Sequence, residues 1–393
     1  MPQSRRNLLK AAAAAPAAAS AASRSGSRSP DASVYTRLGV KPVINGMGTV
    51  TVLGGSLMPP EVIRAMDEAA RFFIPLPELH RKAGEHLAKI LNVPGALVTG
   101  GAASSFTVAA AACMTRGDQK KLRQLPDTAG LPHEIIMQKA HRSGYEHQFT
   151  LTGARIVTVE TMQELEAAAG PHTAMMFFLN KAEPHGQIKR GDWIRVARQR
   201  GIPTFNDAAA DVPGKDRLTL YVQQGFDLVT FSGGKGLLGP QSSGLLIGRK
   251  DLTDAGAHAQ SPAGGIGRGM KVGKEEIVGL VAAVERYLRV DHEAEIRELD
   301  RKVSEMMSAL NRVKGVKAAR HVPEIANEVP HLAVDWDESR GLTAAQVHEQ
   351  LQKGDPAIYT LMRGPGQLLI SVWMMQGSEH RIVARRLQEI LSA

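Results

Sequence analysis

Three short stretches of this chain carry residue types that could act together in covalent catalysis. Lys235 follows the apolar run 229–231 and stands in a loop of small residues, 232–236. An amine in a loop with so little side-chain bulk can form a Schiff base with a carbonyl compound. Asp207 ends a second apolar stretch, 202–206, and a Gly-rich turn at 99–105 precedes both.

The Gly-rich turn has the composition of a phosphate cradle. Gly100 and Gly101 allow close approach to the backbone, and Ala102 adds little bulk. A helix that starts near Ser104 would direct free backbone amides and its dipole at an anion. The ordinary alternative is a strand-to-helix turn in which Ser104 caps the helix.

Asp207 and Lys235 follow the Gly-rich turn in the sequence. Asp207 would pair with a ring nitrogen and keep it protonated, although a solvated turn aspartate is the simpler interpretation. Asp211 lies four residues further on and is the weaker candidate. Lys235 would carry the Schiff base and then serve as a general base, although it could also be a surface lysine. Phosphate cradle, carboxylate and lysine in this order predict pyridoxal 5′-phosphate (PLP) as cofactor.

Alternating strands and helices would position these residues. The candidate strands are mostly short and apolar on both faces, which is typical of central parallel strands. They are residues 96–99, 134–138, 155–159, 174–179, 202–206, 227–231 and 244–248, with helices at 105–114, 161–169 and 192–200 between them. The pattern predicts a doubly wound α/β domain, in which ligands bind at the carboxyl ends of the strands. Asp207 and Lys235 both fall at such ends.

The predicted organisation has four parts. Residues 31–60 form an N-terminal segment, 61–285 the large domain and 286–393 a small C-terminal α+β domain. A long helical pattern, 274–310, leads out of the large domain. The small domain has candidate strands at 331–335 and 368–372 and helices at 344–352 and 378–391.

Residues 1–30 predict an export signal followed by a linker. Paired Arg5 and Arg6 open the run SRRNLLK, and an alanine-rich tract, 11–22, follows. This pattern is typical of a twin-arginine signal and predicts a periplasmic or extracellular protein. A basic, disordered tail is the alternative. The tract is too short and too weakly apolar for a membrane span.

The composition excludes several classes of function. The chain has 393 residues and a net charge of +9, but five of its basic residues stand in the first thirty, which contain no acid. The remaining excess is mild and scattered, so we expect no nucleic-acid partner. The single cysteine, Cys113, excludes an intrachain disulfide and a cysteine-based zinc cluster, and we predict no metal site.

Four collinear segments carry a resemblance to a known family. They are residues 45–56 (NGMGTVTVLGGS), 98–104 (VTGGAAS), 231–241 (FSGGKGLLGPQ) and 270–276 (MKVGKEE). The chain resembles the selenocysteine-synthase-like branch of fold type I PLP enzymes over nearly everything after residue 35. It is more similar to the D-glucosaminate-6-phosphate ammonia-lyase group than to selenocysteine synthase itself. The resemblance implies a large, mostly parallel, doubly wound sheet domain with a smaller C-terminal α+β domain.

The resemblance also implies cofactor contacts. His141 follows a strand end where fold type I enzymes place a side chain that stacks on the cofactor ring, although it could equally be a structural histidine. Ser232, at the end of a strand, could hydrogen-bond the phosphate. Asn180 and Gln187 follow the next strand and would approach the cofactor's hydroxyl edge.

Substrate contacts follow from the same resemblance. Arg363 lies in the small domain, where relatives usually hold an arginine that binds a carboxylate. Thr49 and Thr51 would line the entrance, beside Arg268 or Lys271 from a neighbouring subunit. Such sites generally lie between subunits, so we expect a homodimer or a larger homo-oligomer.

Two departures from the family bear on the substrate. An export signal and a linker replace the RNA-binding region of selenocysteine synthase, so charged tRNA is not expected. An exported protein would rarely meet the phosphorylated sugar acid on which the lyase group acts.

The leading hypothesis is a PLP-dependent enzyme acting at the α-carbon of a small amino acid or amino sugar acid. It would be a lyase that works by β-elimination through an internal aldimine at Lys235. Racemisation, transamination and a catalytically silent binding protein with this fold are the alternatives.

Overall fold

The computed structural model describes residues 34–214, 216–337 and 341–392. The predicted signal and linker, residues 1–30, lie outside this part of the chain. The chain divides into two compact units, 1–42 and 43–393. The described residues of the first unit form a single turn of 3-10 helix, Thr36–Leu38. Everything that follows concerns the second unit.

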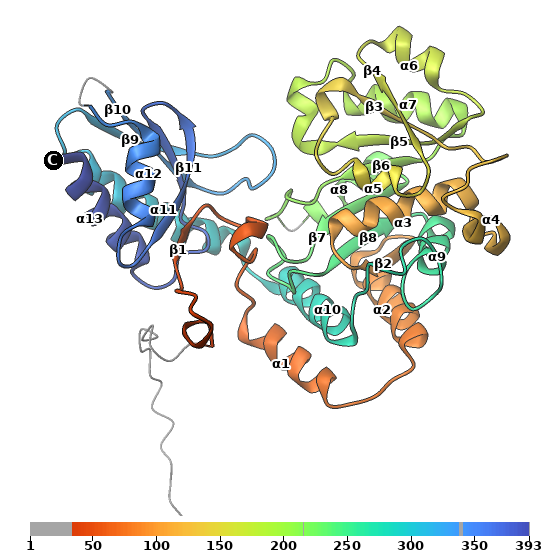
Figure 1. The fold of residues 1–393 in the computed structure, drawn as a ribbon, viewed down its shortest axis with the longest axis horizontal. Helices are drawn as coiled ribbons and strands as arrows, with labels where there is room; N and C mark the ends of the chain where they lie inside the picture. The colour runs from red at the N-terminus through yellow and green to blue at the C-terminus, as the bar shows by residue number, and fades with distance from the viewer. Residues whose placement is uncertain (1–33, 215, 338–340, 393) are drawn as a thin grey trace, which may run out of the picture. The chain divides into compact units, whose positions relative to one another are not determined.

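A seven-stranded sheet dominates this unit (Figure 1). Its order is β2-β8-β7-β6-β5-β3-β4. The strands are β2 (Gly95–Thr99), β3 (Glu134–Gln138), β4 (Arg155–Val159), β5 (Thr173–Leu179), β6 (Thr204–Asp207), β7 (Leu228–Ser232) and β8 (Gly244–Gly248). Neighbouring strands from β7 to β4 pair in parallel. The predicted α/β class with a large, mostly parallel sheet is confirmed.

Strand β8 departs from the parallel arrangement. It pairs antiparallel with both β2 and β7. The connection from β7 to β8, residues 233–243, contains no helix. A parallel crossover needs a connection of about a dozen residues or more, usually with a helix. The loop that carries Lys235 therefore connects two neighbouring antiparallel strands directly, as in a hairpin.

Helices cover both faces of this sheet (Figure 1). One apolar core lies between the sheet and α3 (Ala102–Thr115), α4 (Gln119–Gln124), α5 (His147–Thr150) and α9 (Lys250–Ala259). The core on the other face involves α2 (Leu76–Leu91), α6 (Met162–Ala168), α7 (Arg190–Arg200), α8 (Arg217–Gln224) and α10 (Lys274–Arg289). Helix α1 (Pro60–Ala70) packs on α10. Burial on both faces explains why the strands are apolar throughout.

A five-stranded sheet with its own core forms the smaller α+β part. Its order is β1-β11-β12-β10-β9, and only the pairing of β1 with β11 is parallel. The strands are β1 (Ile44–Gly46), β9 (Val316–His321), β10 (His331–Trp336), β11 (Ile358–Gly364) and β12 (Gln367–Ser371). Helices α11 (His292–Leu310), α12 (Ala344–Gln352) and α13 (Glu379–Ser392) share its core.

The long helical pattern predicted at 274–310 is two helices. Helix α10 ends at Arg289, and α11 begins at His292 after Asp291. The Asp291 side chain accepts a hydrogen bond of 2.9 Å from the Ala294 backbone N–H and so caps the second helix.

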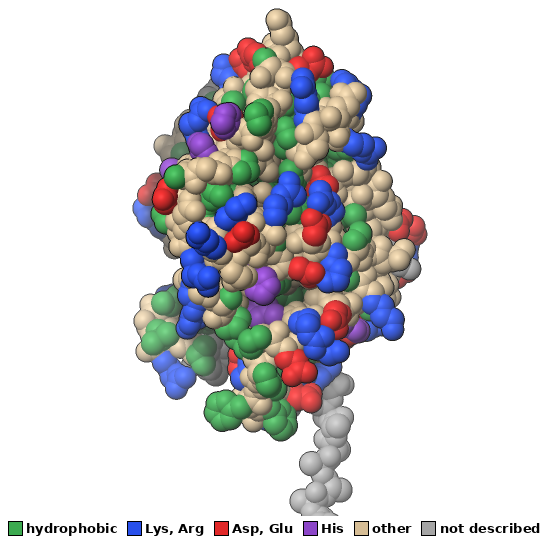
Figure 2. All heavy atoms as spheres, turned by 90° about the vertical axis from the view of Figure 1, so that its right-hand side faces the viewer, with side chains coloured by type: hydrophobic (Ala, Val, Ile, Leu, Met, Phe, Trp, Pro, Cys, Tyr) green, Lys and Arg blue, Asp and Glu red, His purple; other side chains and the backbone are tan. Residues whose placement is uncertain are grey.

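The surface mixes charges of both signs. On the face drawn in Figure 2, basic and acidic side chains are interspersed, and hydrophobic side chains gather at the lower end. Among the helices of the described residues, none combines the length and apolarity that crossing a bilayer requires.

Candidate active site

The Gly-rich turn joins β2 to α3 in a conformation that requires glycine. Gly101 has φ 115° and ψ 160°, a region that other residues rarely adopt. A Cβ added to Gly101 would meet nothing within 4 Å. Helix α3 begins at Ala102, two residues before Ser104, and no side chain among the described residues caps it because the N-cap residue is Gly101. Ser104 lies within the first turn, and its hydroxyl donates to the Gly100 carbonyl at 3.0 Å. The first-turn amides of α3 are thus left to an anion rather than to a serine cap.

Buried hydroxyls fix this turn to the sheet. Ser105 Oγ lies 2.8 Å from Thr99 Oγ1 and accepts from Thr230 Oγ1 at 2.9 Å. These contacts join β2, α3 and β7. A Cβ on Gly244 of β8 would lie 2.5 Å from the Gly101 carbonyl carbon, so the turn rests directly on β8. The position of the turn over these strands is therefore set by packing.

Asp207 is the last residue of β6 and pairs with Thr230 of β7. Because side chains alternate along a strand, Asp207 shares a face with Phe205, which packs in the α3 core. The carboxylate is 8% exposed and its Oδ1 accepts from the Ala209 backbone N–H at 2.9 Å. Burial raises the pKa of Asp207, while the bond to Ala209 and the charge of Lys235 lower it less. Within the described residues Oδ2 has no hydrogen bond and could accept one from a ring N–H.

Lys235 is half-buried in the β7–β8 loop. The loop is held by bonds from Gly233 N to Ser243 O, from Leu238 N to Lys235 O and from Gly239 N to Gly233 O, at 2.8–2.9 Å. Leu238 has φ 56°, which is uncommon for a residue with a side chain. Burial lowers the pKa of the Lys235 amine, and the nearby charge of Asp207 opposes this. Asp207 ends β6, and Lys235 follows the end of the neighbouring parallel strand β7, so the predicted amine and carboxylate lie at the same edge of the sheet.

The N-terminal segment closes over the lysine loop. Ser56 N donates to Gly234 O at 2.9 Å, and Gln241 Nε2 donates to the Thr51 carbonyl at 3.0 Å. Thr51 lies in a 3-10 turn, Thr51–Leu53, and its side chain is exposed. The Thr51 backbone therefore contacts the lysine loop, and the role of its side chain at the entrance stays a prediction.

Two residues from the smaller part of the unit also reach the site. A Cβ on Gly236 would lie 2.9 Å from Trp373 Cη2 and 2.2 Å from Val212 Cγ2. Asn327 N donates to Ala210 O at 2.7 Å, close after Asp207 in the chain. No sequence motif marks Trp373 or Asn327, because only the folded chain brings them to the lysine loop.

Thr49 joins this group. It is 6% exposed, and its Oγ1 donates to Asn327 Oδ1 at 3.5 Å. Ala326 and Asn327 have φ angles of 61° and 49°. Consecutive left-handed residues other than glycine are strained, and such strain concentrates at functional sites. Thr49 and Asn327 therefore form a wall beside the residues that follow Asp207.

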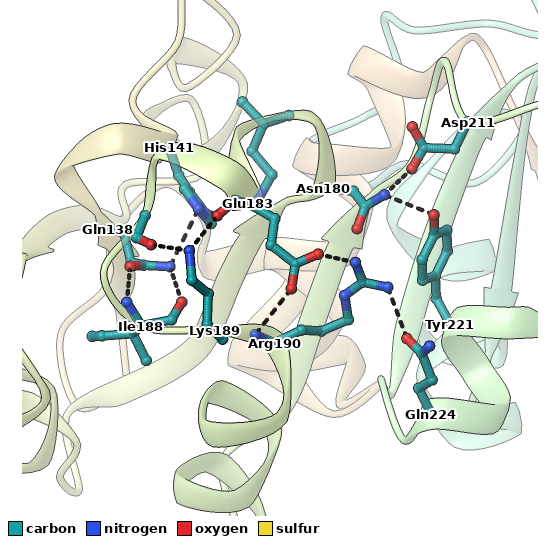
Figure 3. Close-up of polar contacts among 12 residues, drawn as sticks. Gln138, His141, Asn180, Glu183, Ile188, Lys189, Arg190, Asp211, Tyr221 and Gln224 are labelled. Carbon is teal, nitrogen blue, oxygen red and sulfur yellow. Dashed lines mark hydrogen bonds and ion pairs between the residues drawn. The ribbon is translucent and has the colours of Figure 1, made fainter. Parts of the chain in front are cut away.

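His141 does not take the place expected for a ring-stacking side chain. It is 0% exposed and lies edge-on to Phe178 with ring centroids 4.5 Å apart. Leu179 N donates to its Nδ1 at 3.1 Å, and its Nε2 lies 3.2 Å from Gln138 Nε2 (Figure 3). Burial, with a smaller effect from Lys189, lowers the pKa of His141 to about 4. The ring is a neutral structural group with no exposed face.

Asn180 was predicted to approach the cofactor's hydroxyl edge, but its side chain amide is bound to other residues. It is fully buried, and its Nδ2 donates to Asp211 Oδ2 and, at 2.7 Å, to the Tyr221 hydroxyl (Figure 3). Burial raises the pKa of Asp211 to about 6. Asp211 is thus a buried acid held by Asn180, whereas Gln187 is exposed.

The remaining predicted residues are spread more widely. Ser232 is half-buried at the end of β7, and within the described residues its hydroxyl has no hydrogen bond. Arg268 and Lys271 are exposed, and the Lys271 carbonyl lies against Gly100. Arg363 is exposed on β11, and its Nη1 donates to His321 Nε2 at 3.1 Å. No contact places Arg363 at the lysine loop in the described part of the chain.

The residues present fit PLP. An uncapped helix start behind Gly101 and the Ser232 hydroxyl suit a phosphate, the second oxygen of Asp207 suits a pyridine N–H, and Lys235 suits an aldehyde. All lie at the carboxyl ends of strands in one sheet, where such folds bind ligands.

Comparisons with known proteins agree with this site. The family model "L-seryl-tRNA selenium transferase" (SelA) matches residues 186–342. A 5'-C-glycyluridine monooxygenase-decarboxylase from Streptomyces is 31% identical over 385 residues, covering 94% of each chain. A D-glucosaminate-6-phosphate ammonia lyase from Salmonella typhimurium is 31% identical over 372 residues, covering 91% of this chain and 98% of the other.

Solved structures show the same fold. The structure of a D-glucosaminate-6-phosphate ammonia-lyase superposes with a TM-score of 0.79 at 30% identity, over 91% of this chain and 98% of that one. A NifS-like protein shares the fold alone, with a TM-score of 0.55 at 17% identity over 89% of this chain and 100% of that one. The fold and site thus define a fold type I PLP-dependent enzyme. The chain belongs to the SelA-like family of these enzymes.

Proposed function

We propose that the protein is a PLP-dependent lyase that removes a β-substituent and releases ammonia from a small amino acid or amino sugar acid. The observation that carries the proposal is that Asp207, Lys235 and the Gly101 turn follow strands β6, β7 and β2 at the same edge of one sheet. The similarity to an ammonia lyase along nearly the whole chain supports the reaction class.

The protein's own groups have separate tasks in this reaction. When bound, PLP supplies an electron-withdrawing ring that stabilises negative charge at the substrate α-carbon. Asp207 would keep a proton on the ring nitrogen through its second oxygen. Lys235 would take the α-proton, a task that suits an amine whose pKa burial has lowered. The β7–β8 loop and the Ser56 contact hold this amine in place.

The substrate side of the site would be the wall made by Thr49 and Asn327, together with Trp373. The Asn327 side chain amide offers donors to an oxygen-rich substrate, and its backbone is fixed by Ala210. This wall supplements the predicted contacts from Thr51, Arg268 and Arg363, which stay predictions.

A second reaction class has a specific observation in its favour. The similar monooxygenase-decarboxylase has the same identity as the lyase, 31%, over 385 residues against 372. Oxygen-dependent decarboxylation would start from the same lysine and ring and would consume O₂. Racemisation and transamination also share these residues.

Spectroscopy and product analysis test the proposal together. The purified protein should show a visible absorbance band that borohydride abolishes. Lys235→Ala should lose both this reduction product and turnover, whereas Lys181→Ala, at an exposed lysine whose charge also acts on Lys235, should keep both. D- and L-amino acids and amino sugar acids, with and without phosphate, are screened for ammonia and keto acid. O₂ uptake, inverted chirality or transferred nitrogen would assign the other reactions, and turnover by Lys235→Ala would end the proposal.

We also propose export of the protein by the predicted signal at residues 1–30. The support is the paired Arg5 and Arg6 before the alanine-rich tract. Fractionation of cells expressing the wild type and the double variant Arg5→Lys, Arg6→Lys tests this, because twin-arginine signals depend on both arginines. Identical distributions of the two proteins would refute export by this route.

A homodimer is proposed from an exposed apolar surface. Phe72, Phe73 and Ile74, between α1 and α2, are 61%, 104% and 41% exposed, and Leu57 and Ile63 are also exposed. This connection lies at the lower end of Figure 1, the end at which Figure 2 shows hydrophobic side chains gathered. A second copy of this chain would cover such a patch. Phe73→Glu should shift the mass measured by light scattering toward that of a monomer, and a monomeric wild type would refute the proposal.

A further inference from the structure

A hollow of about 510 Å³ lies between α11 and α13, which lie side by side in Figure 1. Its size falls within the range of small-molecule sites. None of the residues assigned to the cofactor lines it. The lining side chains come from Arg301, Ser304, Glu305, Met306, Ser308, Ala309, Arg312, His380, Arg381, Ala384, Arg385 and Gln388.

The charge of this hollow is strongly positive. Four arginines line it, and Glu305 is its one lining carboxylate. Arg301 and Arg381 both pair with Glu305, the latter through Nε at 2.9 Å. Arg312 and Arg385 have no carboxylate partner within the described residues. Two guanidinium groups, one at each helix, thus remain available to a ligand.

Glu305 organises the paired arginines. The buried His380, 1% exposed, places its Nε2 3.0 Å from Glu305 Oε2. Arg301 is held from a second side by Glu298 at 2.7 Å. Bonds from Arg381 and His380 lower the pKa of Glu305 to about 2, so it stays ionised. Glu305 thus holds Arg301 and Arg381, while Arg312 and Arg385 stay exposed to solvent.

Neutral donors extend the same surface. Ser304 and Ser308 are four residues apart on α11 and therefore lie on one helix face. Both residues line the hollow. A lining made of guanidinium and hydroxyl donors matches a ligand that carries several acceptor oxygens and negative charge.

We propose that this hollow binds a small multivalent anion bearing a phosphate group or several carboxylates. Arg312, in the turn after α11, and Arg385, on α13, bind it from two sides, and the serines of α11 complete its hydrogen bonds. The site is separate from the PLP site and does not depend on the proposed reaction.

Calorimetric titration of the holoenzyme tests the site, because bound PLP occupies the Gly101 turn. The probes are pyrophosphate and citrate, with ionic strength held constant by NaCl. We expect saturable binding of one anion per chain. Arg312→Gln and Arg385→Gln should each weaken it about tenfold or more, the loss typical of a charge-assisted hydrogen bond. Comparing the two probes decides between phosphate and polycarboxylate recognition.

Arg386→Gln is the matched control. Arg386 neighbours Arg385 on α13 but pairs with Glu389 at 2.8 Å and does not line the hollow. This variant should bind the anion as the wild type does, and the visible band of bound PLP reports that each variant is folded. Non-saturable heat, equal losses in all three variants, or full binding by Arg312→Gln and Arg385→Gln would overturn the proposal.

Discussion

Replacing Gly101 with alanine tests the phosphate turn most directly. The backbone there, φ 115° and ψ 160°, costs an alanine about 1–3 kcal/mol. No atom lies within 4 Å of the added Cβ, so no clash within the protein adds to this cost. For a chain of this size, such a loss lowers Tm by roughly 1–4 °C.

The effect on PLP binding should be larger than the effect on stability. The Cβ would enter the space at the start of α3, where the phosphate is expected. Displacing the phosphate from one charge-assisted hydrogen bond costs about 1.5–3 kcal/mol. That loss corresponds to an apparent Kd raised about 10- to 100-fold.

Absorbance titration of apoprotein with PLP, together with thermal unfolding of the apoprotein, separates the two effects. Gly130→Ala is the control, since Gly130 has φ 73°, is exposed and also has no atom within 4 Å of an added Cβ. It should lower Tm without changing PLP affinity. If Gly101→Ala lowers Tm and still binds PLP as tightly as the wild type, the phosphate does not bind at this turn.

Three further outcomes are expected. Gly236→Ala should lower Tm by overpacking, since its Cβ would lie 2.2 Å from Val212 Cγ2, and Val212→Ala in the same chain should restore part of the loss. Asp211→Asn should raise stability by up to about 3 kcal/mol at pH 8 and not at pH 4. The reason is that the pKa of Asp211 in the folded protein, about 6, exceeds its value in the unfolded chain, so ionisation of Asp211 above pH 6 destabilises the fold. A change in Tm that does not depend on pH would contradict this. The rate at which the apoprotein captures PLP should rise with pH and reach a plateau above the lowered pKa of Lys235. Asp207→Asn should move the onset of this plateau to lower pH, because it removes a negative charge that raises the pKa of Lys235. Stopped-flow absorbance measures the shift, and an unmoved plateau would mean that the two groups do not interact.

The main features of the fold could be predicted from continuous apolar runs. Strands 134–138, 155–159 and 244–248 have the predicted bounds. The first and the last are buried on both faces, whereas 155–159 is the edge strand of the sheet and is buried only at Val159. Strands β1, β9 and β11 were missed. β1 has three residues, and β9 and β11 carry exposed polar side chains such as Lys317 and Arg363, so neither shows a clear apolar pattern.

The site was predictable where one short segment contains the chemistry. Lys235, Asp207 and the Gly101 turn can each be proposed from the sequence, because each places a characteristic residue type at the end of an apolar strand. His141 was misplaced because its surroundings depend on Phe178 and Leu179 at the end of β5, which are distant in the sequence. Contacts between distant segments carry no local signal, and the Thr49–Asn327 wall is of that kind.

The pairing of β1 with β11 sets an order of assembly. Ile44 lies opposite Ile358, so the opening residues of this unit find their partner strand only near the end of synthesis. Closing so long a loop makes this pairing a late and slow contact. Until it forms, Thr49 and the segment over Gly234 lack their anchor. We therefore expect the segment over Gly234 to reach its final position after the seven-stranded sheet that carries the lysine loop has formed.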